Sequence, residues 1–207
     1  MNNALIVTSS AQAGQSVSNA LAGSLEQALR ARHPGIEIVR RDVGAAPVPR
    51  LTAETVAGIR GEPETEVEKA ARDLSDRLVA ELRAADLVVI ASPMYNFGMS
   101  STLKSWFDHV LRARVTFRYT ENGPEGLLKG KKAIVIESRA GLYSEGPAAA
   151  MDTQEPHIRT LLSFMGIDDV EWVRAERLAF PDAAPASIGA ATERLQALAG
   201  GELALAA

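Results

Sequence analysis

Short apolar runs alternate along the chain with segments in which apolar residues recur every three or four positions. The runs predict buried strands at residues 4–7, 36–42, 87–91, 133–136 and 170–178. The segments between them predict helices at residues 18–33, 65–82, 103–111, 156–165 and 186–198. Strand and helix alternate throughout, and this order predicts a parallel sheet with helices on both faces.

Local signals mark where several of these elements begin and end. Thr65 suits the N-cap of a long helix, and Pro156 suits the first turn of a later one. Residues 44–52 contain two prolines and a glycine, so we expect a loop there. The Ala-rich C-terminal tail is interpreted as the end of the last helix. The sequence has no internal repeat, and we expect a single domain over residues 1–207.

The composition is that of an ordinary globular domain, with 46% hydrophobic and 23% charged residues. A formal net charge of -4 offers no electrostatic footprint for nucleic acid. Without cysteine the chain has no disulfide, thiol nucleophile or thiolate metal ligand, and its scattered histidines predict no metal site. The N-terminus lacks a signal-peptide pattern, and no apolar run approaches the roughly 18 residues of a membrane helix. We therefore expect a cytoplasmic protein that does not enter a membrane.

The candidate chemistry lies in the loops that follow the first, third and fourth predicted strands, because ligands of open parallel sheets bind at the carboxyl ends of the strands. The first loop, residues 9–19, is rich in hydroxyl groups and leads into a helix N-terminus, which favours an anion. Ser10, Ser16 and Ser18 are the candidate donors to a phosphate. The loop lacks the lysine of a P-loop and the glycines of a dinucleotide fingerprint. The alternative is that these serines only cap the helix.

The second loop, residues 92–100, combines aromatic residues with a methionine, a proline and a glycine. Such a loop suits a flat aromatic ligand, which needs apolar faces to stack on and polar groups at its edge. Asn96 offers both donors and acceptors to the pyrimidine edge of a flavin. The alternative is that Tyr95 and Phe97 fold back into the core.

The third loop, residues 138–143, contains Gly141, which permits close approach of a ligand to the backbone. Two interpretations stay open for its larger side chains: Arg139 is a ligand-site residue or a simple surface residue, and Tyr143 is a lid or an ordinary loop aromatic. Together the three loops supply an anion end and an aromatic end at one edge of the sheet. That combination matches the outline of FMN.

At these loops the chain resembles the FMN-dependent NADH-azoreductases, a family within the flavodoxin-like NAD(P)H:quinone oxidoreductases. The resemblance rests on the stretches SPMYNF at 92–97, LKSWFD at 103–108, VTFRYTENGPEGL at 115–127 and Ser138-Arg139. It extends over nearly the whole chain. It implies a flavodoxin-like three-layer sandwich whose five-stranded parallel sheet has the order 2-1-3-4-5.

The resemblance also implies roles for individual residues. Phosphate-binding positions are matched by Ser10, Ser16, Val17 and Ser18, and flavin-lining positions by Met94, Tyr95, Asn96, Phe97, Ser138, Arg139, Ala140 and Gly141. The family is dimeric, and Phe117 and Tyr119 would help to shape a substrate pocket near the subunit interface. Two departures concern this pocket and the flavin edge: many relatives have Gly-Gly where this chain has Ala140-Gly141, and Tyr143 stands where some have histidine.

The activity that the resemblance implies is ping-pong transfer of hydride from NADH, through FMN, to quinones and azo compounds, with no side chain needed as a catalytic acid or base. NADPH stays open as a second donor. Quinone reduction as the main reaction, with azo cleavage incidental, is an equal alternative. Two further alternatives are a flavodoxin-like electron carrier and a flavin reductase that releases reduced FMN.

Overall fold

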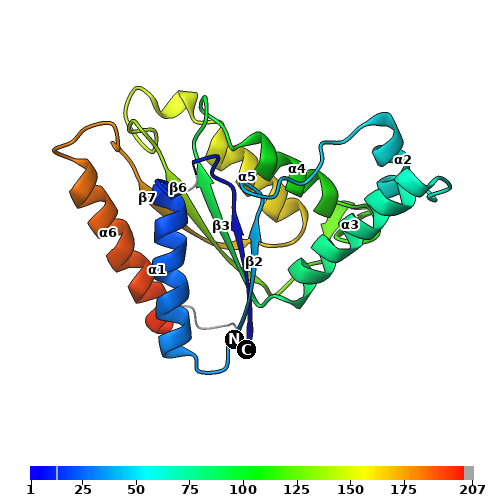
Figure 1. The fold of residues 1–207 in the computed structure, drawn as a ribbon, viewed down its shortest axis with the longest axis horizontal. Helices are drawn as coiled ribbons and strands as arrows, with labels where there is room; N and C mark the ends of the chain where they lie inside the picture. Colours follow the sequence, from blue (N-terminus) through cyan, green and yellow to red (C-terminus); the bar gives the residue numbers. More distant parts are fainter. Residues whose placement is uncertain (13, 203–207) are drawn as a thin grey trace.

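The computed structural model describes residues 1–12 and 14–202 and contains a five-stranded parallel sheet (Figure 1). Its strands lie in the order β2-β1-β3-β6-β7. Their bounds are β1 Asn3–Thr8, β2 Glu37–Asp42, β3 Leu87–Pro93, β6 Lys132–Ser138 and β7 Asp169–Ala175. Because β4 and β5 lie outside this sheet, the order corresponds to the predicted 2-1-3-4-5, and the predicted flavodoxin-like fold is confirmed.

Helices cover both faces of the sheet and make it a three-layer sandwich. In Figure 1 α1 and α6 lie on one side of the sheet, and α3, α4 and α5 lie on the other. The helices are α1 Val17–Arg32, α2 Ala53–Arg60, α3 Glu66–Ala84, α4 Ser101–Val110, α5 Gln154–Phe164 and α6 Ala184–Ala197. A 3-10 turn, η1, spans Ala149–Met151, and a π-helical turn, η2, spans Leu198–Glu202.

The central strand β3 explains why the apolar runs of this chain are continuous. Every residue of β3 is buried, since helices pack against both of its faces. Val88 and Ile90 contact the core under α3, α4 and α5, whereas Leu87 and Val89 contact the core under α1 and α6. A strand with two apolar faces loses the alternation of a half-exposed strand and appears in the sequence as an unbroken run.

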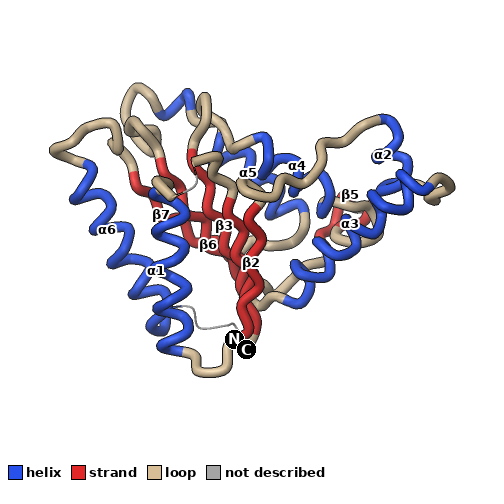
Figure 2. The backbone as a smooth tube through the Cα atoms, in the orientation of Figure 1, coloured by secondary structure: helices blue, strands red, loops and turns tan. Residues whose placement is uncertain are grey.

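The stretch 115–127, which carries part of the resemblance, contains an antiparallel hairpin beside the main sheet (Figure 2). Its strands are β4 Phe117–Thr120 and β5 Gly123–Gly126. An ion pair between Arg118 and Glu125, 2.7 Å long, joins the two strands. Gly126 packs directly on the backbone of Gly166, where a Cβ would lie 2.1 Å from the Gly166 nitrogen, so the hairpin is held against the end of α5.

Several element boundaries differ from the prediction for local reasons. The short helix α2 was not predicted; Thr52 and Thr55 form a capping box at its N-terminus. The fifth strand of the sheet ends at Ala175 and not near residue 178, because the backbone turns at Arg177, whose φ is 59°. The predicted helical end of the Ala-rich tail falls on residues 203–207, outside the described residues. No helix in the described part of the chain is long and apolar enough to cross a membrane.

Candidate functional site

The three predicted loops meet at the carboxyl edge of the sheet, next to the pair β1 and β3. The Tyr95 hydroxyl accepts a hydrogen bond from the Ala11 N–H at 3.1 Å and lies 3.3 Å from the Ser10 hydroxyl, which joins the first and second loops. The Met94 N–H donates to the Ser138 carbonyl at 2.9 Å, which joins the second and third. Since β1 has β2 on one side and β3 on the other, this edge is the point where the strand order reverses.

The first loop ends in a helix N-terminus with free donors. Ser16 is the N-cap of α1, and its hydroxyl accepts from the Asn19 N–H at 3.3 Å. The Ser18 hydroxyl lies 3.2 Å from that of Ser16. Within the described residues the N–H groups of Val17 and Ser18 have no acceptor, and the first turn holds no acidic side chain. Ser16 therefore caps the helix and still leaves an anion-binding terminus open.

A glycine that the sequence analysis did not single out supports the first loop. A Cβ at Gly44 would lie 2.1 Å from the Ser10 carbonyl oxygen, so the backbone after β2 packs directly against Ser10. The Gly44 N–H donates to the Asp42 carboxylate at 3.0 Å and holds this close approach. A glycine in a loop was the available signal, but its contact with Ser10 depends on the pairing of β1 with β2.

The second loop is a tight turn in an uncommon backbone conformation. Asn96 and Phe97 have φ values of 48° and 71°, and the backbones of Tyr95 and Gly98 bond to each other on either side of them. Left-handed non-glycine residues cost on the order of 1 to 3 kcal/mol each and gather at ligand sites. The side chain of Phe97 is 39% exposed and Tyr95 is half-buried, so the alternative that both fold into the core is wrong.

Thr153, which precedes α5, holds the strained turn in place. Its N–H and its hydroxyl both donate to the Phe97 carbonyl, at 3.0 and 2.7 Å. In the described structure the N–H groups of Asn96 and Phe97 have no protein acceptor. They are therefore available to the polar edge of a ligand. Nothing in the sequence pointed to Thr153, because it lies far along the chain from the turn it supports.

The third loop presents its backbone and buries its largest side chain. Arg139 is 1% exposed, so the interpretation as a surface residue is wrong, and its N–H donates to the Ala175 carbonyl at 2.9 Å. Ser138 is buried, while Ala140 is exposed and Gly141 is half-buried. A Cβ at Gly141 would lie 3.0 Å from the ring of Tyr143, so the turn is closely packed.

The predicted substrate-pocket residues fall in two places within one chain. Tyr143 meets Phe97 edge to face, with ring centroids 6.0 Å apart, beside the second loop. Phe117 and Tyr119 instead line a separate cavity of about 700 Å³ between the hairpin, α2 and α4. Phe117 packs on Phe164 at 4.6 Å, and Tyr119 is 73% exposed. The described residues of the chain contain no group of histidines and carboxylates arranged to hold a metal ion.

These features fit FMN. A terminal phosphate suits the free N–H groups and hydroxyls of the first loop, which can bind its charge without a cation. A flat ring with a polar edge suits the second and third loops, whose aromatic side chains flank free backbone donors.

The sheet order and a ligand edge beside β1 and β3 define a flavodoxin-like protein. In agreement, residues 2–199 match the family of the flavodoxin-like fold. The class leaves open which of its many activities this chain has.

Comparison with individual relatives identifies one family within this fold. An FMN-dependent NADH:quinone oxidoreductase of Hyphomonas neptunium is 54% identical over 200 residues, 96% of each chain. An Escherichia coli K12 protein of the same name is 49% identical, covering 87% of this chain and 89% of its own. An azoreductase structure from Bacillus anthracis superposes with a TM-score of 0.88 at 29% identity, covering 97% of this chain and 99% of its own. The chain belongs to the family of FMN-dependent NADH:quinone oxidoreductases.

Proposed function

We propose that this protein is an FMN-dependent NADH:quinone oxidoreductase that also reduces azo compounds. The observation that carries the proposal is the convergence of three loops at the β1 and β3 edge, with free N–H groups at a helix N-terminus and in a strained aromatic turn. The family supports the same activity, since close relatives over the whole chain carry that name.

The phosphate of FMN would lie at the start of α1. Its donors there would be the hydroxyls of Ser10, Ser16 and Ser18 and the N–H groups of Val17 and Ser18. These side chains are buried or nearly so, which orients their hydroxyls and lowers the cost of fixing them on binding. A neutral set of donors holds the charge by several short hydrogen bonds.

The isoalloxazine ring would lie between the second and third loops. Its contacts there would come from the residues of the two loops, namely Met94, Tyr95, Asn96, Phe97, Ser138, Arg139, Ala140 and Gly141. Arg139 would contribute through its backbone, because its side chain is buried beneath the loop. The strained Asn96–Phe97 turn is fixed by Thr153 before any ligand arrives, so its N–H groups are preorganised.

FMN, when bound, supplies the hydride chemistry that links NADH to the acceptor. The protein's part is to bind and orient, and to exclude water from the ring face. NADH and the acceptor would occupy the same face in turn, which gives ping-pong kinetics. NADPH is proposed as a second donor. The cytoplasm, which holds a pool of NADH, is the proposed location.

A homodimer would complete the substrate pocket. Within one chain Phe117 and Tyr119 lie at a cavity separate from the second and third loops. The ring of Tyr119 is largely exposed and meets Phe117 edge to face, with ring centroids 5.6 Å apart. A second copy could bring this aromatic cavity over the flavin of its partner, where it would close the pocket.

The experiment is to load the purified protein with FMN and to follow oxidation of NADH with and without a quinone. Initial rates at several fixed quinone concentrations should give parallel double-reciprocal lines, the pattern of a ping-pong enzyme. Absence of quinone-dependent NADH oxidation in an FMN-loaded sample would refute the proposal. Sedimentation of the loaded protein tests the dimer separately.

A further inference from the structure

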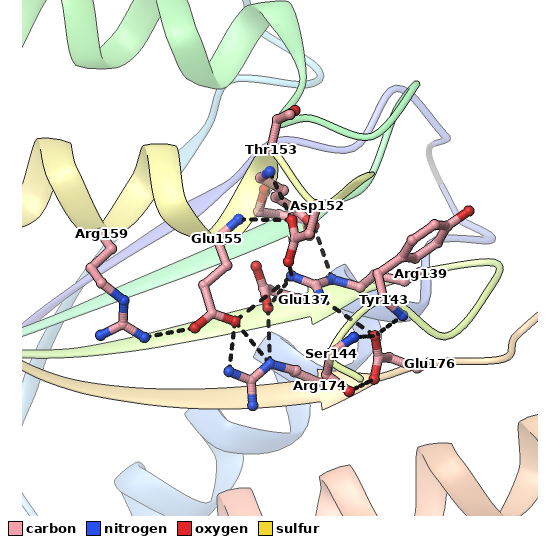
Figure 3. A network of polar contacts seen from close by, with 12 residues as sticks. Glu137, Arg139, Tyr143, Ser144, Asp152, Thr153, Glu155, Arg159, Arg174 and Glu176 are labelled. Carbon is pink, nitrogen blue, oxygen red and sulfur yellow. Dashed lines mark hydrogen bonds and ion pairs between the residues drawn. The ribbon is translucent and has the colours of Figure 1, made fainter. Parts of the chain in front are cut away.

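A cluster of charged side chains lies beneath the third loop, and the proposed function uses none of them directly (Figure 3). Arg139 is at its centre, fully buried between β6, β7 and the start of α5. Its Nη2 lies 2.7 Å from Glu137 Oε2 and 3.0 Å from Asp152 Oδ2. Its Nε donates to Gln154 Oε1 at 3.2 Å, and its Nη1 to Glu176 Oε1 at 3.3 Å.

Glu176 connects Arg139 to the backbone of the third loop. Its Oε1 accepts from the N–H groups of Tyr143 and Ser144 at 2.8 and 3.0 Å, and its Oε2 from the Ser144 hydroxyl. Burial opposes ionisation of Glu176, but these bonds and Arg139 hold the pKa of its carboxyl below the usual range. Glu176 is therefore a carboxylate that fixes the loop by accepting hydrogen bonds from two consecutive backbone N–H groups. In the described structure the N–H of Gly141 remains without an acceptor.

Gln154 connects Arg139 to the second loop. Its Nε2 donates to the Ser92 carbonyl at 2.8 Å and lies 2.9 Å from the Ser92 hydroxyl. Ser92 immediately precedes Pro93 and the aromatic turn, and Gln154 immediately follows Thr153, which holds that turn. One buried chain of contacts thus runs from Ser92 through Gln154, Arg139 and Glu176 to the third loop.

This network is not an efficient way to stabilise a fold. The free energy needed to remove several charges from water often exceeds the attraction between them, and apolar residues of similar volume often stabilise a core better. What such a network supplies is geometry: a planar guanidinium with fixed donors sets the distance and angle between its partners. Here the partners are attached to the two loops between which the ring of FMN is proposed to lie.

We propose that Glu176 and Gln154 are positioning residues, joined through Arg139, that hold the second and third loops at the spacing required by the flavin ring. The inference rests on the proposed function. Neither Glu176 nor Gln154 would contact the cofactor. The affinity for FMN and the environment of the bound ring would nevertheless depend on Glu176.

The test compares Glu176→Ala with Glu176→Asp and with a matched control. Glu171→Ala removes a glutamate from the same strand region, where it pairs with Arg194 at 3.0 Å on the surface. For each apoprotein the measurements are the dissociation constant for FMN by quenching of flavin fluorescence, the visible circular dichroism of bound FMN, and the midpoint of thermal unfolding.

We expect Glu176→Ala to weaken FMN binding by about tenfold or more, since it releases two loop N–H groups and leaves Arg139 with one carboxylate fewer. The visible circular dichroism of the bound flavin should change as well. Glu176→Asp should recover part of both effects, and Glu171→Ala should stay within about twofold of the wild type. A network that serves only stability would lower the unfolding midpoint and leave the spectrum of the bound flavin unchanged.

Glu176→Gln covers the case in which the alanine variant does not fold, because it keeps the size of the side chain and removes its charge. Unchanged FMN affinity and an unchanged flavin spectrum in whichever of these variants folds would overturn the inference while leaving the proposed function intact. If the wild-type protein itself does not bind FMN, the proposed function is wrong and the inference falls with it.

Discussion

Replacing Glu137 with glutamine should remove a pH dependence that is built into the folded protein. Glu137 lies in β6 and is fully buried, and burial raises the pKa of its carboxyl from 4.5 to about 7, although Arg139 opposes this. Its Oε1 has no hydrogen-bond partner among the described residues. In the unfolded chain the same carboxyl loses its proton near its usual pKa, so the folded state binds the proton more tightly.

Proton linkage gives the sign and the magnitude of this change in stability with pH. Stability from the protonated Glu137 is fully present below pH 4.5 and is lost as the pH rises toward about 7. The difference between the two pKa values corresponds to a total of about 3 kcal/mol in the free energy of unfolding. Glu137→Gln stays neutral, so its stability relative to the wild type should increase by more than about 2 kcal/mol between about pH 5 and about pH 8.

The assay is urea unfolding of the apoprotein at these two pH values, with the variant and the wild type measured in parallel. Titrating groups away from Glu137 are common to both proteins and cancel in the difference. Glu137→Asp is the matched control: it keeps a carboxyl at this position and should keep the pH dependence, even if the shorter side chain lowers stability. A difference between Glu137→Gln and the wild type that does not change with pH would refute the reasoning.

Three further predictions concern the loops and the pocket. Ser16→Ala removes the N-cap bond to Asn19 and a phosphate donor, so the apoprotein should lose about 1 kcal/mol in urea unfolding and FMN should bind more weakly in a fluorescence titration. Gly44→Ala places a Cβ 2.1 Å from the Ser10 carbonyl, so it should cost about 1 to 3 kcal/mol in the same unfolding assay and weaken FMN binding as well. Tyr119→Ala should raise the KM for quinone in steady-state kinetics, because the proposed dimer places this ring in the substrate pocket, and it should change FMN affinity less, because the ring lies outside the loops that would hold the cofactor.

The parallel sheet could be predicted from the sequence because its strands are buried on both faces. Residues such as Leu87 and Ile90 in β3 are apolar in succession, and the helices between strands show a separate periodicity. Strand order was available only through the resemblance, since the apolar pattern is the same for any order. The structure supplies the pairing that places β1 between β2 and β3.

The hairpin β4–β5 and the helix α2 show where sequence patterns were insufficient. β5 consists of Gly123, Pro124, Glu125 and Gly126, which have no strand propensity, and tertiary contact at Gly166 holds it in place. The helix α2 is short, and its capping residues follow a loop rich in proline. The hairpin depends on contact with a distant part of the chain, whereas α2 is too short to show a periodicity and packs on the next helix, α3, through Gly58.

The candidate site was predicted in outline because strand ends meet at one edge of a parallel sheet. Its supporting residues were not predicted. Arg139 looked like a loop residue, since the partners that bury it, Gln154 and Glu176 among them, follow well after it in the chain. The separation of Tyr119 from Tyr143 was equally hidden, because both residues lie near glycines and outside the helices and strands predicted from the sequence.

The central claim is that bound FMN passes electrons from NADH to a quinone, and an anaerobic titration tests it most directly. FMN-loaded protein is mixed with NADH in a stopped-flow instrument while the absorbance of the oxidised flavin is followed, and a quinone is then added. The account predicts that NADH bleaches the flavin and that the quinone restores its absorbance. Firmly bound FMN that NADH does not reduce would contradict it and would favour an electron carrier supplied by another reductase.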